Sequence, residues 1–213
     1  MSGEIDDQTL VIAARTGDLQ AFNLLVDRYQ DLLFRIAQRM LGDEDSAADA
    51  AQVAWLSAFR KLGEFRGGRL KTWLSRITVN ACYDELRLQH RRREVPLVPR
   101  TAEEPDGDGA FWLEDPTPGV EELVLRNEFD TVVQACLRSL APVYRSMLIL
   151  VDIEGMSYEE AAVAAHVPLG TVRSRLARAR DALREQLRQW SLMEPVMQRW
   201  VAQPDQQHSV RCS

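Results

Sequence analysis

The segment that most constrains the fold is residues 157–180, SYEEAAVAAHVPLGTVRSRLARAR. Ser157 precedes Glu160 by three residues, which is the spacing of a capping box at the start of a helix. A break follows, marked by Pro168 and Gly170. Beyond it, apolar residues recur on one helical face, at Val172, Leu176, Ala179 and Leu183. The segment therefore predicts two helices joined by a short turn.

The second of these helices is rich in arginine. Six arginines lie between residues 173 and 188, against two acidic residues. In a helix-turn-helix the second helix lies in the DNA major groove, where a guanidinium can pair with guanine or bind a phosphate. Arginines on an amphipathic helix are also common as a solvated face. The motif therefore favours DNA binding but does not fix its kind.

Composition narrows the classes of protein. Hydrophobic residues make up 46% of the 213 residues, which is enough for one or two small packed domains. No apolar run is long enough to span a membrane, and the acidic start MSGEIDDQTL differs from a signal peptide, so we expect a cytoplasmic protein without membrane insertion. Cys82, Cys136 and Cys212 are widely spaced and no Cys/His cluster appears, so we expect no disulfide framework, metal or cofactor site.

Charge is distributed unevenly along the chain. The net charge of −6 disfavours a tight, free-standing DNA binder. Residues 60–93 nevertheless carry ten basic and three acidic residues, whereas residues 101–130 carry ten acidic residues and one arginine. With the arginine-rich helix, this gives two basic zones separated by an acidic connector. We expect nucleic-acid contact at two places, conditional on another partner.

The first 95 residues show helical periodicity throughout. After a short first helix, Asp18 is expected to cap a second helix that stops at Gly42. A third helix is expected over residues 46–62, with Phe59 facing inward. After a loop, Thr72 is expected to cap a fourth helix. These elements predict an all-α N-terminal domain.

The composition changes after residue 95. Residues 96–120 are rich in proline, glycine and acidic residues and predict a flexible linker, within which Phe111, Trp112 and Leu113 form an apolar island. Helices are expected to resume at Glu121. The tail after Trp190 carries an apolar stripe that either packs back on the second domain or forms a separate contact.

Two ordered blocks of the chain resemble the extracytoplasmic-function sigma factors of bacterial RNA polymerase, the compact two-domain members of the sigma-70 family. The first block contains GDLQAFNLLVDRYQDLLFRIAQRMLGD and LKTWLSRITVNACYDELR, and the second contains LAPVYRSMLILVDIEGMSYEEAA and VPLGTVRSRLARAR. The resemblance implies an all-α fold of two small helical domains. Its expected parts are sigma domain 2 in residues 1–95, the acidic linker in 96–120, the helix-turn-helix sigma domain 4 in 121–190 and a tail in 191–213.

The resemblance also implies a function. An alternative sigma factor binds core RNA polymerase and directs transcription initiation at specific promoters. Domain 2 melts the −10 element and reads it as a single strand, and domain 4 reads the −35 element as a duplex. The family is commonly held inactive by an anti-sigma factor, so such a regulator is an expected partner. Promoter recognition of this kind needs no enzymatic activity and no cofactor.

Roles carry over position by position from the family. The polymerase-docking stretch matches Asp49, Gln52, Val53 and Leu56, although Ala48 and Val53 stand where acidic residues are common. The loop and helix that read the −10 element match Arg66, Arg69, Lys71, Ser75, Arg76 and Asn80. Trp73 is ambiguous, and its spacing favours a core position over stacking on a base.

In the recognition helix, the groove-facing positions match Arg173, Ser174, Ala177 and Arg178. Arg175 and Arg180 match phosphate-contacting positions, and Thr171 is expected to cap the helix and hold a phosphate at its N-terminus. Ala177 is smaller than the residue that many family members carry there.

Two other classes of protein compete with this interpretation. A stand-alone helix-turn-helix regulator would explain residues 121–188 and would bind palindromic sites as a dimer, but it leaves the first 95 residues without a role. An enzyme is disfavoured because His90, His166 and His208 are isolated and no phosphate-binding glycine loop or nucleophile motif is present.

Overall fold

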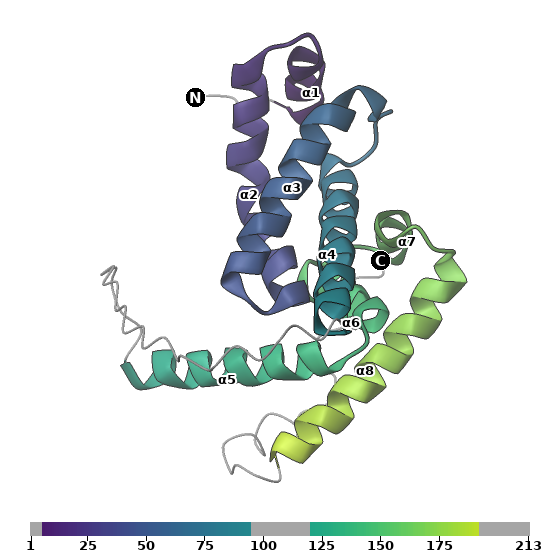
Figure 1. Ribbon diagram of the computed structural model, residues 1–213. Coiled ribbons are helices and arrows are strands. Elements are labelled where there is room, and N and C mark those ends of the chain that lie inside the picture. The colour runs from purple at the N-terminus through teal and green to yellow at the C-terminus, as the bar shows by residue number, and fades with distance from the viewer. Residues whose placement is uncertain (1–5, 95–119, 192–213) are drawn as a thin grey trace.

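The computed structural model describes residues 6–94 and 120–191, and every regular element in these ranges is a helix (Figure 1). The N-terminal group comprises α1 (Asp7–Arg15), α2 (Leu19–Leu41), α3 (Glu44–Lys61), the short turn η1 (Leu62–Glu64) and α4 (Leu70–Glu94). The C-terminal group comprises α5 (Val120–Ser139), α6 (Pro142–Leu148), η2 (Ile149–Ile153), α7 (Tyr158–Ala165) and α8 (Leu169–Ser191). None of the helices described is long and apolar enough to cross a membrane. The all-α expectation is confirmed.

Short polar side chains and glycine set the helix ends in the N-terminal group. The Asp18 carboxylate accepts hydrogen bonds from the backbone N–H groups of Gln20 (2.9 Å) and Ala21 (3.1 Å), as expected of the cap of α2. Gly42 ends α2 with a left-handed φ of 75°, and a Cβ there would collide with the Arg138 side chain. Asp43 caps α3 through the N–H of Ser46 (2.8 Å), so α3 begins two residues earlier than the sequence suggested.

The N-terminal group packs α3 and α4 against α2. The contact faces of α3 are lined by alanines, which let the helix backbones approach closely. Large apolar side chains of α2 and α4 fill the remaining space, among them Leu25, Leu33, Ile36, Met40, Leu74 and Val79. This bundle holds the loop between η1 and α4 at one end of the molecule (Figure 1).

The two helical groups share one hydrophobic core, and polar bonds cross the seam between them. Gln134 of α5 donates hydrogen bonds to the carbonyls of Gln38 (2.9 Å) and Arg39 (3.2 Å), in the last turn of α2. The buried guanidinium of Arg145 donates to the carbonyl of Met40. In Figure 1, α6 and α7 lie beside the lower part of α4. The helices on either side of the acidic connector therefore pack closely together.

Several local expectations differ from the structure. Because α4 begins at Leu70, Thr72 lies in its first turn, and its hydroxyl bonds to Glu160 instead of capping the helix. Thr171 is likewise inside α8, which begins at Leu169. Gly170 is helical, and the left-handed residue that ends α7 is His166 (φ 53°). The proline-rich connector and the tail lie outside the described residues.

Candidate nucleic-acid interface

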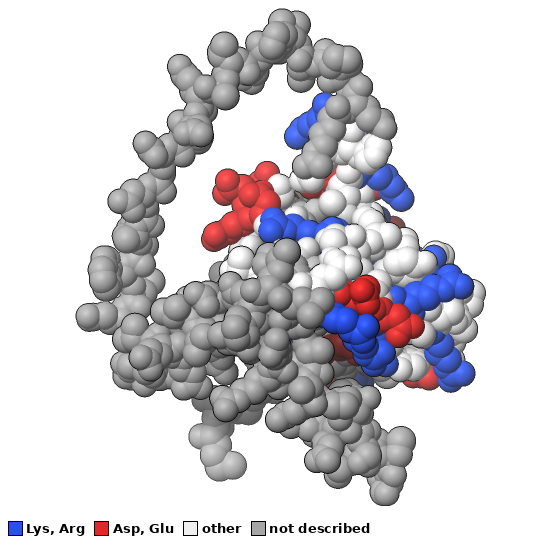
Figure 2. Space-filling model, turned by 90° about the horizontal axis from the view of Figure 1, so that it is seen from below, with Lys and Arg blue, Asp and Glu red and all other residues white. Residues whose placement is uncertain are grey.

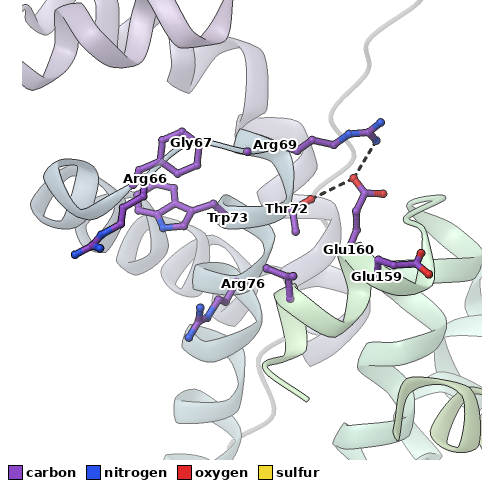
Figure 3. A pocket seen from close by; sticks show the side chains of 11 residues that line it. Arg66, Gly67, Arg69, Thr72, Trp73, Arg76, Glu159 and Glu160 are labelled. Atoms are coloured by element: carbon purple, nitrogen blue, oxygen red, sulfur yellow. Dashed lines mark hydrogen bonds and ion pairs between the residues drawn. The ribbon is translucent and has the colours of Figure 1, made fainter. Parts of the chain in front are cut away.

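The loop between η1 and α4 borders a hollow of about 410 Å³ at the junction of the two helical groups (Figure 3). Gly67 and Gly68 adopt φ values of 97° and 92°, which side-chain-bearing residues rarely adopt, so the glycine pair is required for this loop shape. Phe65 is buried and its ring lies 5.3 Å from the half-buried ring of Trp73. Trp73 is thus packed against the core and also borders the hollow.

Cationic side chains surround this hollow. Arg66 and Arg69 are exposed on the loop, and Arg76 follows in the second turn of α4. The Arg69 guanidinium lies 2.9 Å from the Glu160 carboxylate of α7, and Lys71 donates to the carbonyl of Glu154 (2.8 Å). Two of the expected −10 cations are therefore occupied by the C-terminal group in this arrangement.

The two remaining −10 candidates on α4 differ in their exposure to solvent. Asn80 is exposed, as a base-contacting amide requires. Ser75 is fully buried, and its hydroxyl has no hydrogen-bond partner in this arrangement, so its expected contact with DNA stays a prediction. Ser75 lies on the covered side of α4, because its neighbours Leu74, Thr78 and Val79 are buried as well.

The recognition helix α8 has the two faces that its sequence pattern predicts. The apolar side chains Val172, Leu176 and Ala179 are buried against the C-terminal group. The candidate groove-facing residues are exposed, namely Arg173, Ser174, Ala177 and Arg178. This exposed face carries guanidinium and hydroxyl donors of the kind that read base edges.

The candidate phosphate-contacting side chains of α8 are either paired with another protein group or half-buried. Arg180 forms two hydrogen bonds to the Asp152 carboxylate, at 3.0 and 2.6 Å, and this contact raises the pKa of its guanidinium. Arg180 thus fastens α8 to the η2 turn. Arg175 is half-buried. Burial raises the pKa of Tyr83, and the nearby charge of Arg175 offsets part of this rise. Thr171 is half-buried in the first turn.

A third surface lies on α3. Asp49 and Gln52 are exposed, and Val53 and Leu56 are 52% and 51% exposed. Phe59, one turn further on, was expected inside but is 49% exposed, with its edge packed on Phe22. Exposed apolar side chains in a row are unusual on a solvated helix and indicate a protein contact. The helical spacing Val53, Leu56, Phe59 is the signal that could have identified Phe59.

Comparison with known proteins identifies the family of this chain. Residues 25–92 match Sigma-70 region 2, and residues 131–183 match Sigma-70 region 4. The RNA polymerase sigma-H factor of Pseudomonas aeruginosa is 38% identical over 180 residues, covering 83% of this chain and 91% of that protein. The ECF RNA polymerase sigma-E factor of Escherichia coli K12 is 38% identical over 184 residues, covering 86% and 95%. The chain belongs to the extracytoplasmic-function sigma factors of the sigma-70 family.

Solved structures resemble this sigma factor as well. CnrH in complex with the cytosolic domain of CnrY matches with a TM-score of 0.60 and 25% identity, covering 85% of this chain and 96% of that one. The sigma factor RpoE in complex with the anti-sigma factor NepR from Bartonella quintana matches with a TM-score of 0.58 and 26% identity, covering 78% and 96%. The protein is therefore an alternative sigma factor, a transcription initiation factor whose two sigma regions correspond to the two helical groups.

One face of this sigma factor carries charges of both signs. On the face shown in Figure 2, lysine and arginine side chains are interspersed with aspartate and glutamate. Opposite charges also lie next to each other within single helices, as in the ion pairs of Arg184 with Asp181 (3.1 Å) and Arg87 with Asp84 (2.9 Å). A face with charges of both signs attracts the phosphate backbone of DNA less than a face of positive charge alone.

Proposed function

We propose that this sigma factor uses three separate surfaces, each of which binds a different partner. The exposed row on α3 binds core RNA polymerase, the loop and α4 bind the −10 element, and the exposed face of α8 reads the −35 element. The strongest support is that the residues that match the family's docking and groove-facing positions are also exposed. The four docking candidates and the four groove-facing candidates are all solvent-exposed, while Ala54 and Leu176, which lie between them on the same helices, are buried.

On the −10 side, the hollow beside the loop suits one unstacked base. Its aromatic wall, formed by Phe65 and Trp73, offers an apolar surface, and Arg66, Arg69 and Arg76 supply cations for the flanking phosphates. Holding a base out of the stack offsets a cost of a few kcal/mol, which stacking and phosphate contacts together are able to supply. Lys71 and Asn80 extend the contact along α4. Ser75 is buried in this arrangement, so its contact with DNA requires this side of α4 to be uncovered first.

On the −35 side, Arg173, Ser174, Ala177 and Arg178 face the major groove. Arg175 binds phosphate once α8 leaves the neighbourhood of Tyr83. Thr171, half-buried in the first turn of α8, supports a phosphate bound at the helix N-terminus. Arg180 stabilises the C-terminal group, because its guanidinium forms an ion pair with Asp152.

Regulation by an anti-sigma protein is part of the proposal. Two similar proteins are described in complexes, CnrH with the cytosolic domain of CnrY and the sigma factor RpoE with the anti-sigma factor NepR. The exposed apolar row on α3 is a surface that such a protein is able to cover in competition with polymerase. We place this competition in the cytoplasm, where core polymerase acts on DNA.

The test is a transcription assay with purified protein, bacterial core RNA polymerase and a pool of genomic DNA fragments. Start sites that appear only with this protein, and that share elements near −10 and −35, support the proposal. Binding to duplex DNA without polymerase, at palindromic sites, would instead favour the stand-alone regulator. If no specific start site appears, the assay is repeated with core polymerase from the source organism, which controls for a core enzyme that this sigma factor does not bind.

A further inference from the structure

A second hollow, of about 530 Å³, lies between the C-terminal end of α2 and α5, which passes below that end in Figure 1. Its volume falls within the range of small-molecule sites, about 300–1,000 Å³. Gln134 of α5 lines it and also bonds to the carbonyls of Gln38 and Arg39, which fixes the two walls relative to each other. The hollow shares no lining residue with the one beside the loop before α4.

The lining of this second hollow is predominantly cationic. Arg35 and Arg39 of α2 and Arg138 of α5 contribute three positive charges, whereas Asp130 is the one acidic residue among the described lining residues. A hollow with this excess of guanidinium groups attracts an anion, and because its walls come from both helical groups, a bound anion would contact both.

Gly42 explains how an arginine of α5 reaches the end of α2. It adopts a φ of 75°, and a Cβ at this position would lie 2.3 Å from the Cδ atom of Arg138. The missing side chain therefore leaves the space in which the Arg138 stem lies. In this way the turn that ends α2 also brings the third guanidinium to the hollow.

The protein partners of these arginines bind them only loosely. The Arg39 guanidinium lies 3.5 Å from the Asp130 carboxylate, and the Arg138 guanidinium lies 3.4 Å from the Gly42 carbonyl. Arg35 lies 3.5 Å from the Glu154 carboxylate. Charge-assisted hydrogen bonds are shorter, about 2.7–2.9 Å. Each guanidinium carries five N–H donors, so all three retain donors for a further acceptor.

The surroundings favour a small ligand over a nucleic-acid strand. Asp43, Glu44 and Asp45 follow Gly42 directly and are exposed, so they repel a long phosphate backbone at this end of α2. Within the hollow, half-buried Phe34 offers an apolar wall. Gln38 also lines it, and its Oε1 receives no hydrogen bond from the described residues. A nucleobase amino group in the hollow would give this amide a donor to turn toward.

We propose that this hollow binds a small ligand with two or more phosphate groups, either a nucleoside polyphosphate or a bare polyphosphate. The planar fork of arginine suits phosphate oxygens, and adjacent phosphates allow one ligand to engage guanidiniums of α2 and α5 together. Such a ligand stabilises the packing of the two helical groups, because it binds the folded, packed arrangement. The site shares no residue with the three surfaces of the proposed function.

The test is isothermal titration calorimetry of the full chain with pyrophosphate, ATP and GTP, without divalent metal and at constant ionic strength. We expect saturable binding of one equivalent and a rise of the thermal midpoint with ligand concentration. Arg138→Gln should weaken binding at least about fivefold, because it removes a charge that faces the phosphates. The matched control is Arg184→Gln, the same change at an exposed site on α8, which should bind as wild type does.

A second variant, Arg35→Gln, guards against a folding defect in the first, because the Arg35 side chain is 57% exposed. It should weaken binding in the same way. No saturable binding below about 1 mM, or an equal loss in Arg184→Gln, would overturn the proposal.

The three ligands and one further variant distinguish the two sources of phosphate. If ATP and GTP bind more tightly than pyrophosphate, and Phe34→Leu removes that advantage, the ligand is a nucleotide whose base lies against Phe34. Equal binding of all three ligands, unchanged in Phe34→Leu, identifies a bare polyphosphate. Either result supports the phosphate site.

Discussion

At the scale of single residues, Arg145 places a positive charge inside the protein. Its side chain is buried and donates to the carbonyls of Met40, Arg138 (2.6 Å) and Leu140 (3.0 Å), which the ends of α2 and α5 leave without helical partners. Burial lowers its pKa, and the charge of Arg138 lowers it further. The guanidinium therefore joins two helix ends from different groups, and its hydrogen bonds offset the cost of its desolvation.

Arg145→Met should destabilise the protein by about 2–4 kcal/mol, because it leaves several buried carbonyls unpaired. Urea unfolding at equilibrium measures the loss as a shift of the midpoint. The control is Arg184→Met, since Arg184 is exposed and pairs only within α8. A midpoint that moves equally in both variants would mean that the buried bonds contribute nothing.

The groove-facing face of α8 gives a second residue-scale prediction. Arg178→Ala should cost about 1–3 kcal/mol of promoter discrimination, because a bidentate contact with guanine distinguishes that base from the others. The measurement compares transcription from a promoter and from variants changed at single −35 positions. A loss that is the same for every promoter would assign Arg178 to the phosphate backbone instead.

The thiol of Cys82 gives a pH-dependent prediction. It is fully buried in α4, and burial raises its pKa to about 12. The folded pKa lies above the value of 9.0 for an exposed thiol, so this group favours the folded state below pH 9 and loses that contribution as the pH rises toward 12. Iodoacetamide at pH 8 should leave Cys82 unmodified in the folded protein and modify it in guanidinium, as peptide mass spectrometry will show. Rapid modification of the folded protein would refute this.

At the scale of elements, α3 presents a face that the fold itself does not use. Leu56→Asp should reduce affinity for core polymerase at least about tenfold, because it puts a charge into an apolar contact, yet leave the thermal midpoint almost unchanged because Leu56 is half exposed. Ile153→Asp is the matched control, an exposed apolar residue in the η2 turn. Equal loss of polymerase binding in both variants would remove α3 as the specific docking element.

The elements also show what sequence can and cannot predict here. The cap at Asp18, the stop at Gly42 and the capping box at Ser157 depend on residues a few positions apart, so local pattern was sufficient. The contact of Lys71 with the Glu154 carbonyl joins residues 83 positions apart, and no local pattern carries that information. The start of α8 was misplaced because helical Gly170 was taken for a turn residue.

At the scale of the whole molecule, the seam joins the two helical groups into one compact body. The shared core and the bonds from Gln134 and Arg145 stabilise this closed arrangement. If core polymerase binds the two groups apart from each other, its binding must supply the free energy that separates them. A ligand shifts such an equilibrium only by its preference for one state.

Fluorescence energy transfer tests this directly. Dyes placed on Gln30→Cys in α2 and Asp181→Cys in α8, both exposed sites, should show high transfer in the free protein and lower transfer when core polymerase is added. The background carries Cys212→Ser, and the other two cysteines are buried. The same labels in the Leu56→Asp variant should keep high transfer, because a chain that cannot dock gains no free energy for opening. Unchanged transfer in a bound, wild-type complex would mean that the closed arrangement persists on polymerase, and the two elements would then have to be read in turn.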